Sequence, residues 1–189
     1  MVLFVYIALV TACGKGSGDD SSSQGSTGGQ IQKVAPNNDQ AKKAIDQEIR
    51  YRLNKPTSKV KPEDIDKIEE LVISESGITD LAPFKEFINL EKLALYRNPI
   101  TDLTPLKGLS RLKDLQLYNN KITDLTPLKG LTELNHLNIR FNQVSDLTPL
   151  HGLKKLNRLD VRNNPGLTKT DIKQLKEALP RCYLIHSVK

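Results

Sequence analysis

The chain of 189 residues has no Trp, only two Cys and an aromatic content of 5%. Two cysteines are too few for a disulfide-rich scaffold, and alone they cannot supply a four-ligand zinc site. No apolar run approaches the roughly 20 residues that a membrane-spanning helix needs. The sequence also lacks a GKS or GKT phosphate loop and a GxSxG nucleophile motif, and it holds three His. No catalytic residue, metal or cofactor is therefore predicted.

An apolar segment stands near the start of the sequence. Residues 2–10 (VLFVYIALV) are apolar throughout, and Thr11, Ala12 and Cys13 follow. An apolar stretch of this length that ends at small residues is typical of a secretory signal peptide. No Lys or Arg precedes it, so a chance apolar tail and a start placed too late stay open as alternatives. The sequence Val-Thr-Ala-Cys resembles the bacterial lipoprotein box, which implies that Cys13 is lipidated.

The segment after Cys13 is rich in Gly and Ser, with six Gly and five Ser between Gly14 and Gly29. Such a composition cannot bury enough apolar surface to order itself, so it predicts a flexible tether. Gly14 instead of Asp after the cysteine is similar to the pattern exported to the outer membrane in Gram-negative cells. The expected location is the cell envelope, with membrane contact through the lipid alone.

A segment of 22 residues then repeats without insertion. One copy reads LQLYNNKITDLTPLKGLTELNH, and strict self-similarity at such a period predicts a solenoid. Copies begin at Leu71, Leu93, Leu115 and Leu137, and a fifth opens at Leu159. The predicted order is a signal peptide (1–12), a lipidated Cys and tether (13–37), a helical N-terminal cap (38–70), repeats (71–164) and a C-terminal cap (165–189).

Each repeat begins with the pattern L-x-L-x-x-N, whose alternation predicts a short strand with one buried face. Leu115 and Leu117 should point inward, and Asp114, Gln116 and Tyr118 outward. The return segment should bury Ile122, Leu125, Leu128 and Leu131, after a 3₁₀-like turn that begins at Thr126-Pro127. A column of asparagines should satisfy buried backbone groups: Asn98, Asn120, Asn142 and Asn164.

The 22-residue form N-x-I-x-D-L-x-P-L-x-x-L, over residues 68–160, resembles the internalin-like class of leucine-rich repeats. The resemblance implies an α/β fold: a right-handed solenoid with a parallel sheet on its concave side and 3₁₀-like turns on its convex side. The first copy departs from the pattern, with Ser76 for Asn and Phe84 and Phe87 for Leu, as a capping position tolerates.

Both ends of the repeat array carry signals of caps, which a solenoid needs to cover its core. Residues 39–54 place five apolar residues on one helical stripe: Ala41, Ala44, Ile45, Ile49 and Leu53. Pro62 opens a short helical piece, and this stretch is similar to the N-terminal cap of internalin-like proteins. After the repeats, Thr168 and Asp171 have capping-box spacing before a second helix. A strand-like CYLIHSV follows, in which Cys182 is expected to be a small buried apolar residue.

Outward-facing strand positions of successive repeats should form columns about 4.8 Å apart. Tyr and Arg dominate binding hot spots, so we expect the concave face to bind a partner protein. The candidate residues are Tyr96, Tyr118, His136, Arg140, Phe141, Arg158 and Arg162. Cross-strand pairing that only stabilises the sheet is the alternative.

Two further groups have competing interpretations. Asp114 and His136 stand on adjacent repeats, but no Ser or Cys accompanies them, which favours an ion pair over a hydrolase. A basic ladder on the outer face offers a surface for an acidic glycan or envelope polymer: Lys85, Lys107, Lys129 and His151. The formal net charge of +6 favours acidic partners weakly, and no nucleic-acid module is present.

Overall fold

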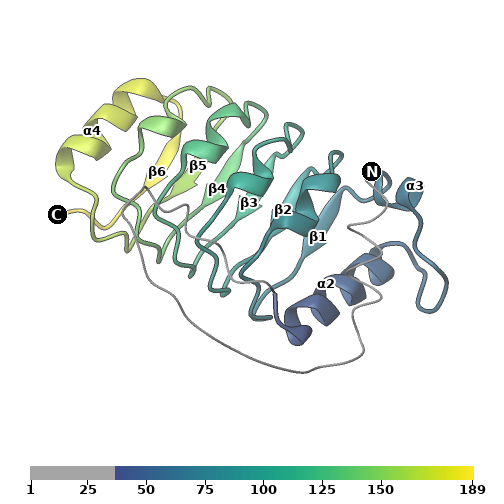
Figure 1. The fold of residues 1–189 in the computed structure, drawn as a ribbon. Coiled ribbons are helices and arrows are strands. Elements are labelled where there is room, and N and C mark those ends of the chain that lie inside the picture. The colour runs from purple at the N-terminus through teal and green to yellow at the C-terminus, as the bar shows by residue number, and fades with distance from the viewer. Residues whose placement is uncertain (1–36) are drawn as a thin grey trace, which may run out of the picture.

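The computed structural model describes residues 37–189. The predicted signal peptide, Cys13 and nearly all of the predicted tether lie outside the described residues. Within them, six short strands lie side by side in chain order to form one parallel sheet (Figure 1). The strands are β1 (Glu70–Val72), β2 (Lys92–Ala94), β3 (Asp114–Gln116), β4 (His136–Asn138), β5 (Arg158–Asp160) and β6 (Tyr183–Ile185). The predicted solenoid is confirmed.

The register of the sheet follows the repeat length from β1 to β5. Leu93 pairs with Leu71 on one side and with Leu115 on the other, and Leu137 and Leu159 continue the row. Because each rung advances by 22 residues, equivalent positions of successive repeats lie beside one another. The predicted columns of outward-facing residues are therefore confirmed.

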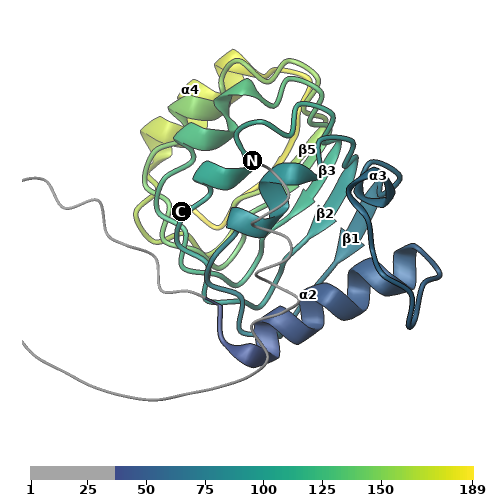
Figure 2. The same cartoon turned by 45° about the vertical axis from the view of Figure 1, so that its right-hand side comes forward.

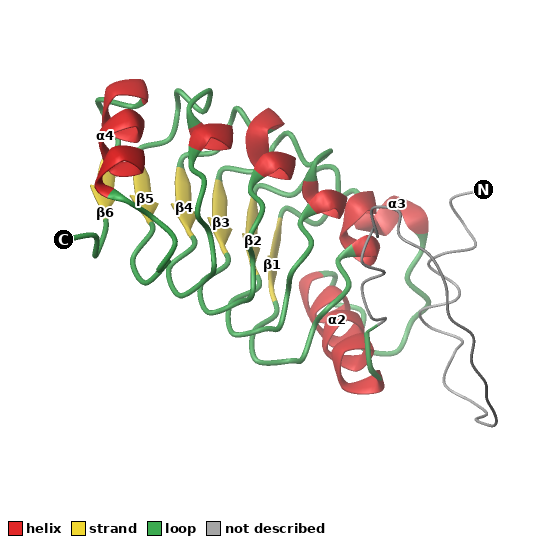
Figure 3. Cartoon of the chain, turned by 60° about the vertical axis from the view of Figure 1, so that its left-hand side comes forward, coloured by secondary structure: helices red, strands yellow, loops and turns green. Residues whose placement is uncertain are grey.

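Short 3₁₀ helices lie on the side of the solenoid away from the strands (Figure 3). Each has Pro at one of its first two positions, where the missing N–H is not needed. An Asp two residues before each helix fixes its start; Asp124 Oδ1, for example, accepts a hydrogen bond of 2.7 Å from Thr126 N. The helices are η1 (Ala82–Glu86), η2 (Thr104–Leu106), η3 (Thr126–Gly130) and η4 (Thr148–Leu150).

The interior is a continuous apolar core that runs the length of the solenoid. Leu115 and Leu117 are fully buried, as predicted for the inward side of β3 and the residue after it. The return segment contributes Ile122, Leu125, Leu128 and Leu131, all at most 1% exposed. In the first repeat, the rings of Phe84 and Phe87 are also buried, with centroids 6.2 Å apart.

The predicted asparagine column is confirmed as a hydrogen-bonded ladder between rungs. Asn120 Oδ1 accepts from Ile100 N at 3.1 Å, and its Nδ2 donates to the carbonyls of Leu95 and Leu117. Asn98, Asn142 and Asn164 make equivalent bonds, and all four are buried. One amide thus satisfies backbone groups of two rungs, which the dry interior requires.

The N-terminal cap comprises α2 (Asp39–Arg52) and α3 (Pro62–Ile65). Helix α2 lies along the β1 end of the sheet (Figure 2), and it buries Ala41, Ile45 and Ile49. It ends two residues before the predicted boundary, because Asn54 adopts a left-handed φ of 51°.

Two polar residues hold the cap in place. Asn37 Oδ1 accepts from the backbone N–H groups of Thr79 and Asp80, so the cap supplies an amide to the one rung that has Ser76 instead of Asn. Asp64, 2% exposed, accepts from Lys61 N and pairs with Lys55 Nζ at 2.6 Å. These bonds, with a second cation at Lys67, hold the pKa of the Asp64 carboxyl well below its usual range.

The C-terminal cap follows its prediction. Helix α4 (Lys169–Ala178) begins at the expected capping box, in which the side chains and backbone groups of Thr168 and Asp171 bond reciprocally. Strand β6 then closes the sheet. Cys182, a free thiol, is half-buried against the core, and burial raises its pKa. A raised pKa leaves little reactive thiolate at neutral pH, which agrees with a packing role.

Candidate functional site

The outward side of the strands, here called the concave face, brings the predicted binding residues together. Its first column holds Ser74, Tyr96, Tyr118, Arg140 and Arg162, each two residues past the end of a strand. Backbone hydrogen bonds continue between rungs beyond the three-residue strands; Asn119 N, for example, donates to Arg140 O at 2.9 Å. Side chains in this column are therefore held at strand spacing.

The aromatic and guanidinium groups of this column stack on one another. The rings of Tyr96 and Tyr118 are parallel within 5°, with centroids 4.5 Å apart. The guanidinium carbon of Arg140 lies 4.6 Å from the Tyr118 ring centroid and 5.9 Å from that of Phe141. Four predicted residues thus form one cluster, here called the aromatic stack, which spans three adjacent repeats.

Arg140 is held by rings and not by carboxylates. Its Nε is buried and has no hydrogen-bond partner within residues 37–189, and no acidic group of that range lies within 4.0 Å of its guanidinium. Contact with the faces of aromatic rings is worth about 0.5–1 kcal/mol at exposed sites and more where water is excluded. The charge of Arg140 is therefore positioned without being neutralised.

Phe141 has an unusual backbone. Its φ is 56°, in the left-handed region that a bulky side chain rarely adopts, and its side chain is 50% exposed. The equivalent residues of the other rungs share this φ: Glu75, Arg97, Asn119 and Asn163. Asn tolerates the conformation well, whereas Phe does not. The sequence carries a signal for this turn, because Asn119 and Asn163 each directly precede an asparagine of the ladder. The left-handed turn was not predicted from this signal.

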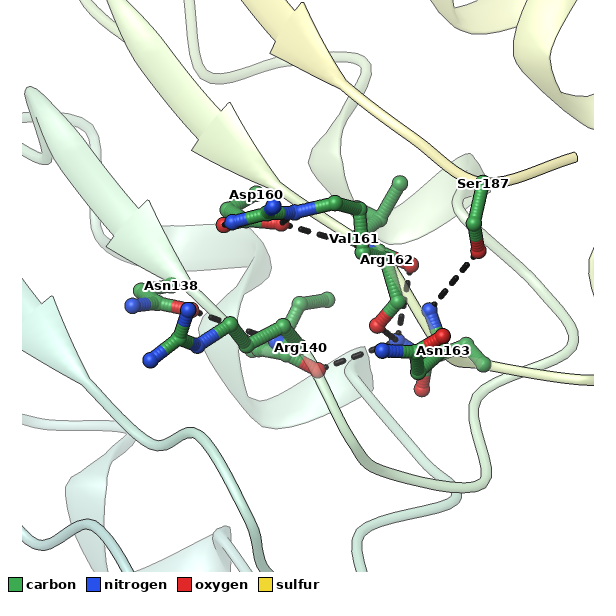
Figure 4. Close-up of polar contacts among 9 residues, drawn as sticks. Asn138, Arg140, Asp160, Val161, Arg162, Asn163 and Ser187 are labelled. Atoms are coloured by element: carbon green, nitrogen blue, oxygen red, sulfur yellow. Dashed lines mark hydrogen bonds and ion pairs between the residues drawn. The ribbon is translucent and has the colours of Figure 1, made fainter.

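Arg162 differs from the rest of its column. Figure 4 shows its guanidinium turned back onto Asp160 of the same rung, with Nη2 and Oδ2 2.6 Å apart. Burial alone would raise the pKa of Asp160, but hydrogen bonds from Arg162 and the charges of Arg162 and Arg140 lower it. The structure therefore places Arg162 at the end of the concave face, tied to a buried carboxylate and separate from the aromatic stack.

The remaining predicted residues lie in the second column. His136 Nδ1 is 3.5 Å from Asp114 Oδ2, so the expected cross-strand pair is present. Arg158 is exposed, and its guanidinium carbon lies 6.0 Å from the Tyr183 ring of β6. Sequence reasoning did not include Tyr183 among the site residues, because the register of β6 departs from the repeat length.

Other chemistry has less support in the part of the chain that the structure describes. No three His, Cys, Asp or Glu side chains among residues 37–189 gather as a metal site would require. The residues of the basic ladder occupy equivalent positions at the convex 3₁₀ helices. Lys85 Nζ lies 3.8 Å from Glu86 Oε1, whereas Lys107 and Lys129 are exposed. Among the described residues, no helix is long and apolar enough to span a membrane.

The repeats match a known family. The model of leucine-rich repeats, which describes two copies at a time, matches residues 88–130 and 110–150. No curated protein matches the sequence at a significant level.

Several solved structures are similar in fold. An internalin, InlF, of Listeria monocytogenes aligns with a TM-score of 0.62 and 26% identity over 84% of this chain and 54% of that one. Internalin C2 of the same organism aligns with a TM-score of 0.52 and 28% identity, over 77% and 85% of the two chains. A leucine-rich-repeat protein of Leptospira interrogans has a TM-score of 0.59 and 25% identity, over 67% and 33%.

This chain spans about half of the InlF chain and a third of the Leptospira chain that it matches. The repeat match, the parallel sheet and the convex 3₁₀ turns agree with one another. Residues 37–189 form a leucine-rich-repeat solenoid that is similar to the internalins.

Proposed function

We propose that this protein is a non-enzymatic binding module of the bacterial envelope, and that its concave face recognises another protein. The observation that carries the proposal is the aromatic stack of Tyr96, Tyr118, Arg140 and Phe141. Extended concave surfaces are the usual binding surfaces of solenoids, and Tyr and Arg contribute most to protein interfaces.

Sheet stabilisation alone explains the stack less well. Ring stacking does stabilise adjacent strands, by about 0.5–1.5 kcal/mol for an aromatic pair. Phe141 adds a large exposed ring at a backbone position that disfavours it. A residue that lowers stability and exposes apolar surface is better explained by a contact outside the chain.

The proposal assigns no reaction to Asp114 and His136. Both side chains lie on the solvated concave face, 3.5 Å apart at their nearest nitrogen and oxygen. The residues around them in the sheet are Lys92, Gln116 and Arg158, and none of these is a Ser or Cys nucleophile. We interpret the pair as a cross-strand ion pair.

Lipid attachment at Cys13 is part of the proposal and rests on the Val-Thr-Ala-Cys sequence after the apolar run. Two or more acyl chains hold a protein stably at a membrane, whereas one chain does so only marginally. Cys13→Ser should release the protein from the membrane fraction or leave it unprocessed. If this variant is found in the membrane fraction to the same extent as the parent protein, the proposed lipid attachment at Cys13 is wrong.

The binding function is tested by affinity capture from envelope extracts with the full chain as bait. Tyr118→Ala with Arg140→Ala should weaken the cognate interaction by about 2 kcal/mol or more, the scale of a hot spot. The matched control is Lys107→Glu with Lys129→Glu on the convex face, which should keep it. Loss of binding in the control but not in the concave variant would favour an acidic glycan or envelope polymer on the basic ladder.

A further inference from the structure

Next to the aromatic stack, the concave face is hollowed by a pocket of about 320 Å³. It lies over β3, β4 and β5, so its walls come from three successive repeats. The lining residues are Gln116, His136, Leu137, Asn138, Arg158 and Asp160.

The pocket presents hydrogen-bond donors. Arg158 is exposed, and no carboxylate of the described chain lies within 4.0 Å of its guanidinium. Asn138 Oδ1 accepts from Arg140 N at 3.3 Å, which leaves the two amide hydrogens on Nδ2 without a partner in residues 37–189 (Figure 4).

The two carboxylates near the pocket are already paired. Asp160 is 6% exposed and bonds Arg162 through both oxygens. Asp114 accepts from Gln116 Nε2 at 2.6 Å and faces His136. The unused groups of the pocket are therefore donors and a cation, which suit an incoming carboxylate.

Charge along the concave face limits what can carry that carboxylate. The second column begins with Glu70, Lys92 and Asp114, so a long polyanion that crossed the sheet would meet two carboxylates before it reached Arg158. Unpaired positive charge is confined to the rungs of β4 and β5, beside the exposed ring of Phe141. A single acidic group with an apolar neighbour fits this surface better than a repeating acidic polymer.

We propose that this pocket binds the carboxylate of an Asp or Glu side chain in an extended segment of a partner protein, while Phe141 and Arg140 contact an apolar side chain of the same segment. Asn138 and Phe141 are three residues apart on one rung, a backbone span of at most about 10 Å. The acidic and apolar residues of the segment should therefore be about three positions apart. This inference names the partner chemistry of the concave face and rests on the proposed function.

A displayed library of random twelve-residue peptides, selected on the full chain, tests the proposal. The selected peptides should be enriched in Asp or Glu about three positions from an apolar residue. Arg158→Glu should weaken a selected peptide roughly tenfold, because the peptide loses a charge-assisted hydrogen bond and meets a like charge. Lys92→Glu is the matched control: it has the same charge change in the same column, about 14 Å away, and should change affinity less than about twofold.

Other outcomes would overturn this inference and leave the proposed function to its own test. Peptides without acidic enrichment that still depend on Tyr118 and Arg140 would mean that the concave face binds protein but not through a carboxylate. If no selected peptide loses affinity when concave-face residues are replaced, the inference of an extended acidic segment is wrong. The affinity capture described above then tests separately whether the concave face binds a folded protein. If polygalacturonate binds in an Arg158-dependent way and no acidic peptide is selected, the occupant is a polyanion.

Discussion

The two sides of the same strands follow different rules. On the inward side, Leu93, Leu115, Leu137 and Leu159 repeat one residue, and the asparagine ladder repeats another. On the concave side, no column keeps a single residue type along all five rungs. The interior must satisfy the same packing and hydrogen-bonding needs at every rung, because each rung has the same neighbours. The concave side of the strands has no such constraint and is free to differ from rung to rung, so it can carry specificity.

Truncation of an inward residue should give the largest effect. Leu115→Ala removes a fully buried side chain between two rungs and should lower the free energy of unfolding by about 2–5 kcal/mol. Its outward neighbour, Gln116→Ala, should change it by less than about 0.5 kcal/mol. Urea denaturation measures both. Equal losses would mean that the two sides of β3 do not differ as described.

Removal of a ladder amide should come next. Asn120→Ala leaves Ile100 N–H without a partner in the dry interior. The carbonyls of Leu95 and Leu117 each lose one of two amide donors and keep those from Asn98 and Asn142. Stranding a buried donor costs about 1–3 kcal/mol of the free energy of unfolding. The control is Asn119→Gly, one residue earlier in the chain. Asn119 is exposed and has a φ of 58°, which glycine adopts readily, so this change should leave the free energy of unfolding nearly unchanged. A neutral Asn120→Ala would show that the ladder does not couple the rungs.

The N-terminal cap should respond to acid through the buried carboxyl of Asp64. Asp64 has a folded-state pKa lowered by Lys55, Lys61 N and Lys67, below the unfolded value of about 4. Its contribution to stability is therefore complete above that value and declines as the pH falls below it. Thermal unfolding should show Asp64→Asn less stable than the parent at pH 7, with a difference that narrows below pH 4. A difference that stays constant to pH 2.5 would contradict the described charge cluster.

The smallest effect should have the opposite sign. Phe141→Asn gives the fourth rung the same residue that Asn119 and Asn163 provide at this φ on the neighbouring rungs. Relief of the backbone should raise the free energy of unfolding by about 0.5–1 kcal/mol, while the contact with Arg140 is lost. Denaturation should show the gain, and the capture experiment should show weaker binding. A variant that is less stable would mean that Phe141 supports the fold.

The repeat period explains why so much of the fold was predictable. Once Leu71, Leu93 and Leu115 align at a fixed interval, the register, the inward leucines and the asparagine ladder all follow from one repeat. The capping box at Thr168 and Asp171 was predictable for a similar reason, since it depends on residues three apart. Predictions failed at helix ends, as at Asn54, where a single φ decides the boundary.

The concave face was predictable in position but not in detail. The columns placed Tyr96, Tyr118 and Arg140 together, yet nothing in their spacing showed that the rings stack or that Arg140 lacks a carboxylate. The pairing of Arg162 with Asp160 also appears only in three dimensions, because it depends on which rotamer each side chain adopts. The pocket over β3, β4 and β5 likewise depends on how side chains from three rungs are arranged.

The sequence by itself determined the parts of this protein that depend on local spacing: the 22-residue rung, its buried face, its 3₁₀ turn and the two caps. A period of two along a strand and a fixed repeat length decide these before any long-range contact forms. Only the tertiary structure decided which charges are neutralised, at Asp160 and Arg162, and which stay available, at Arg140 and Arg158. The physical reason is that ion pairing depends on distances between side-chain tips, on one rung as well as between rungs, and the repeat fixes only where the backbones lie.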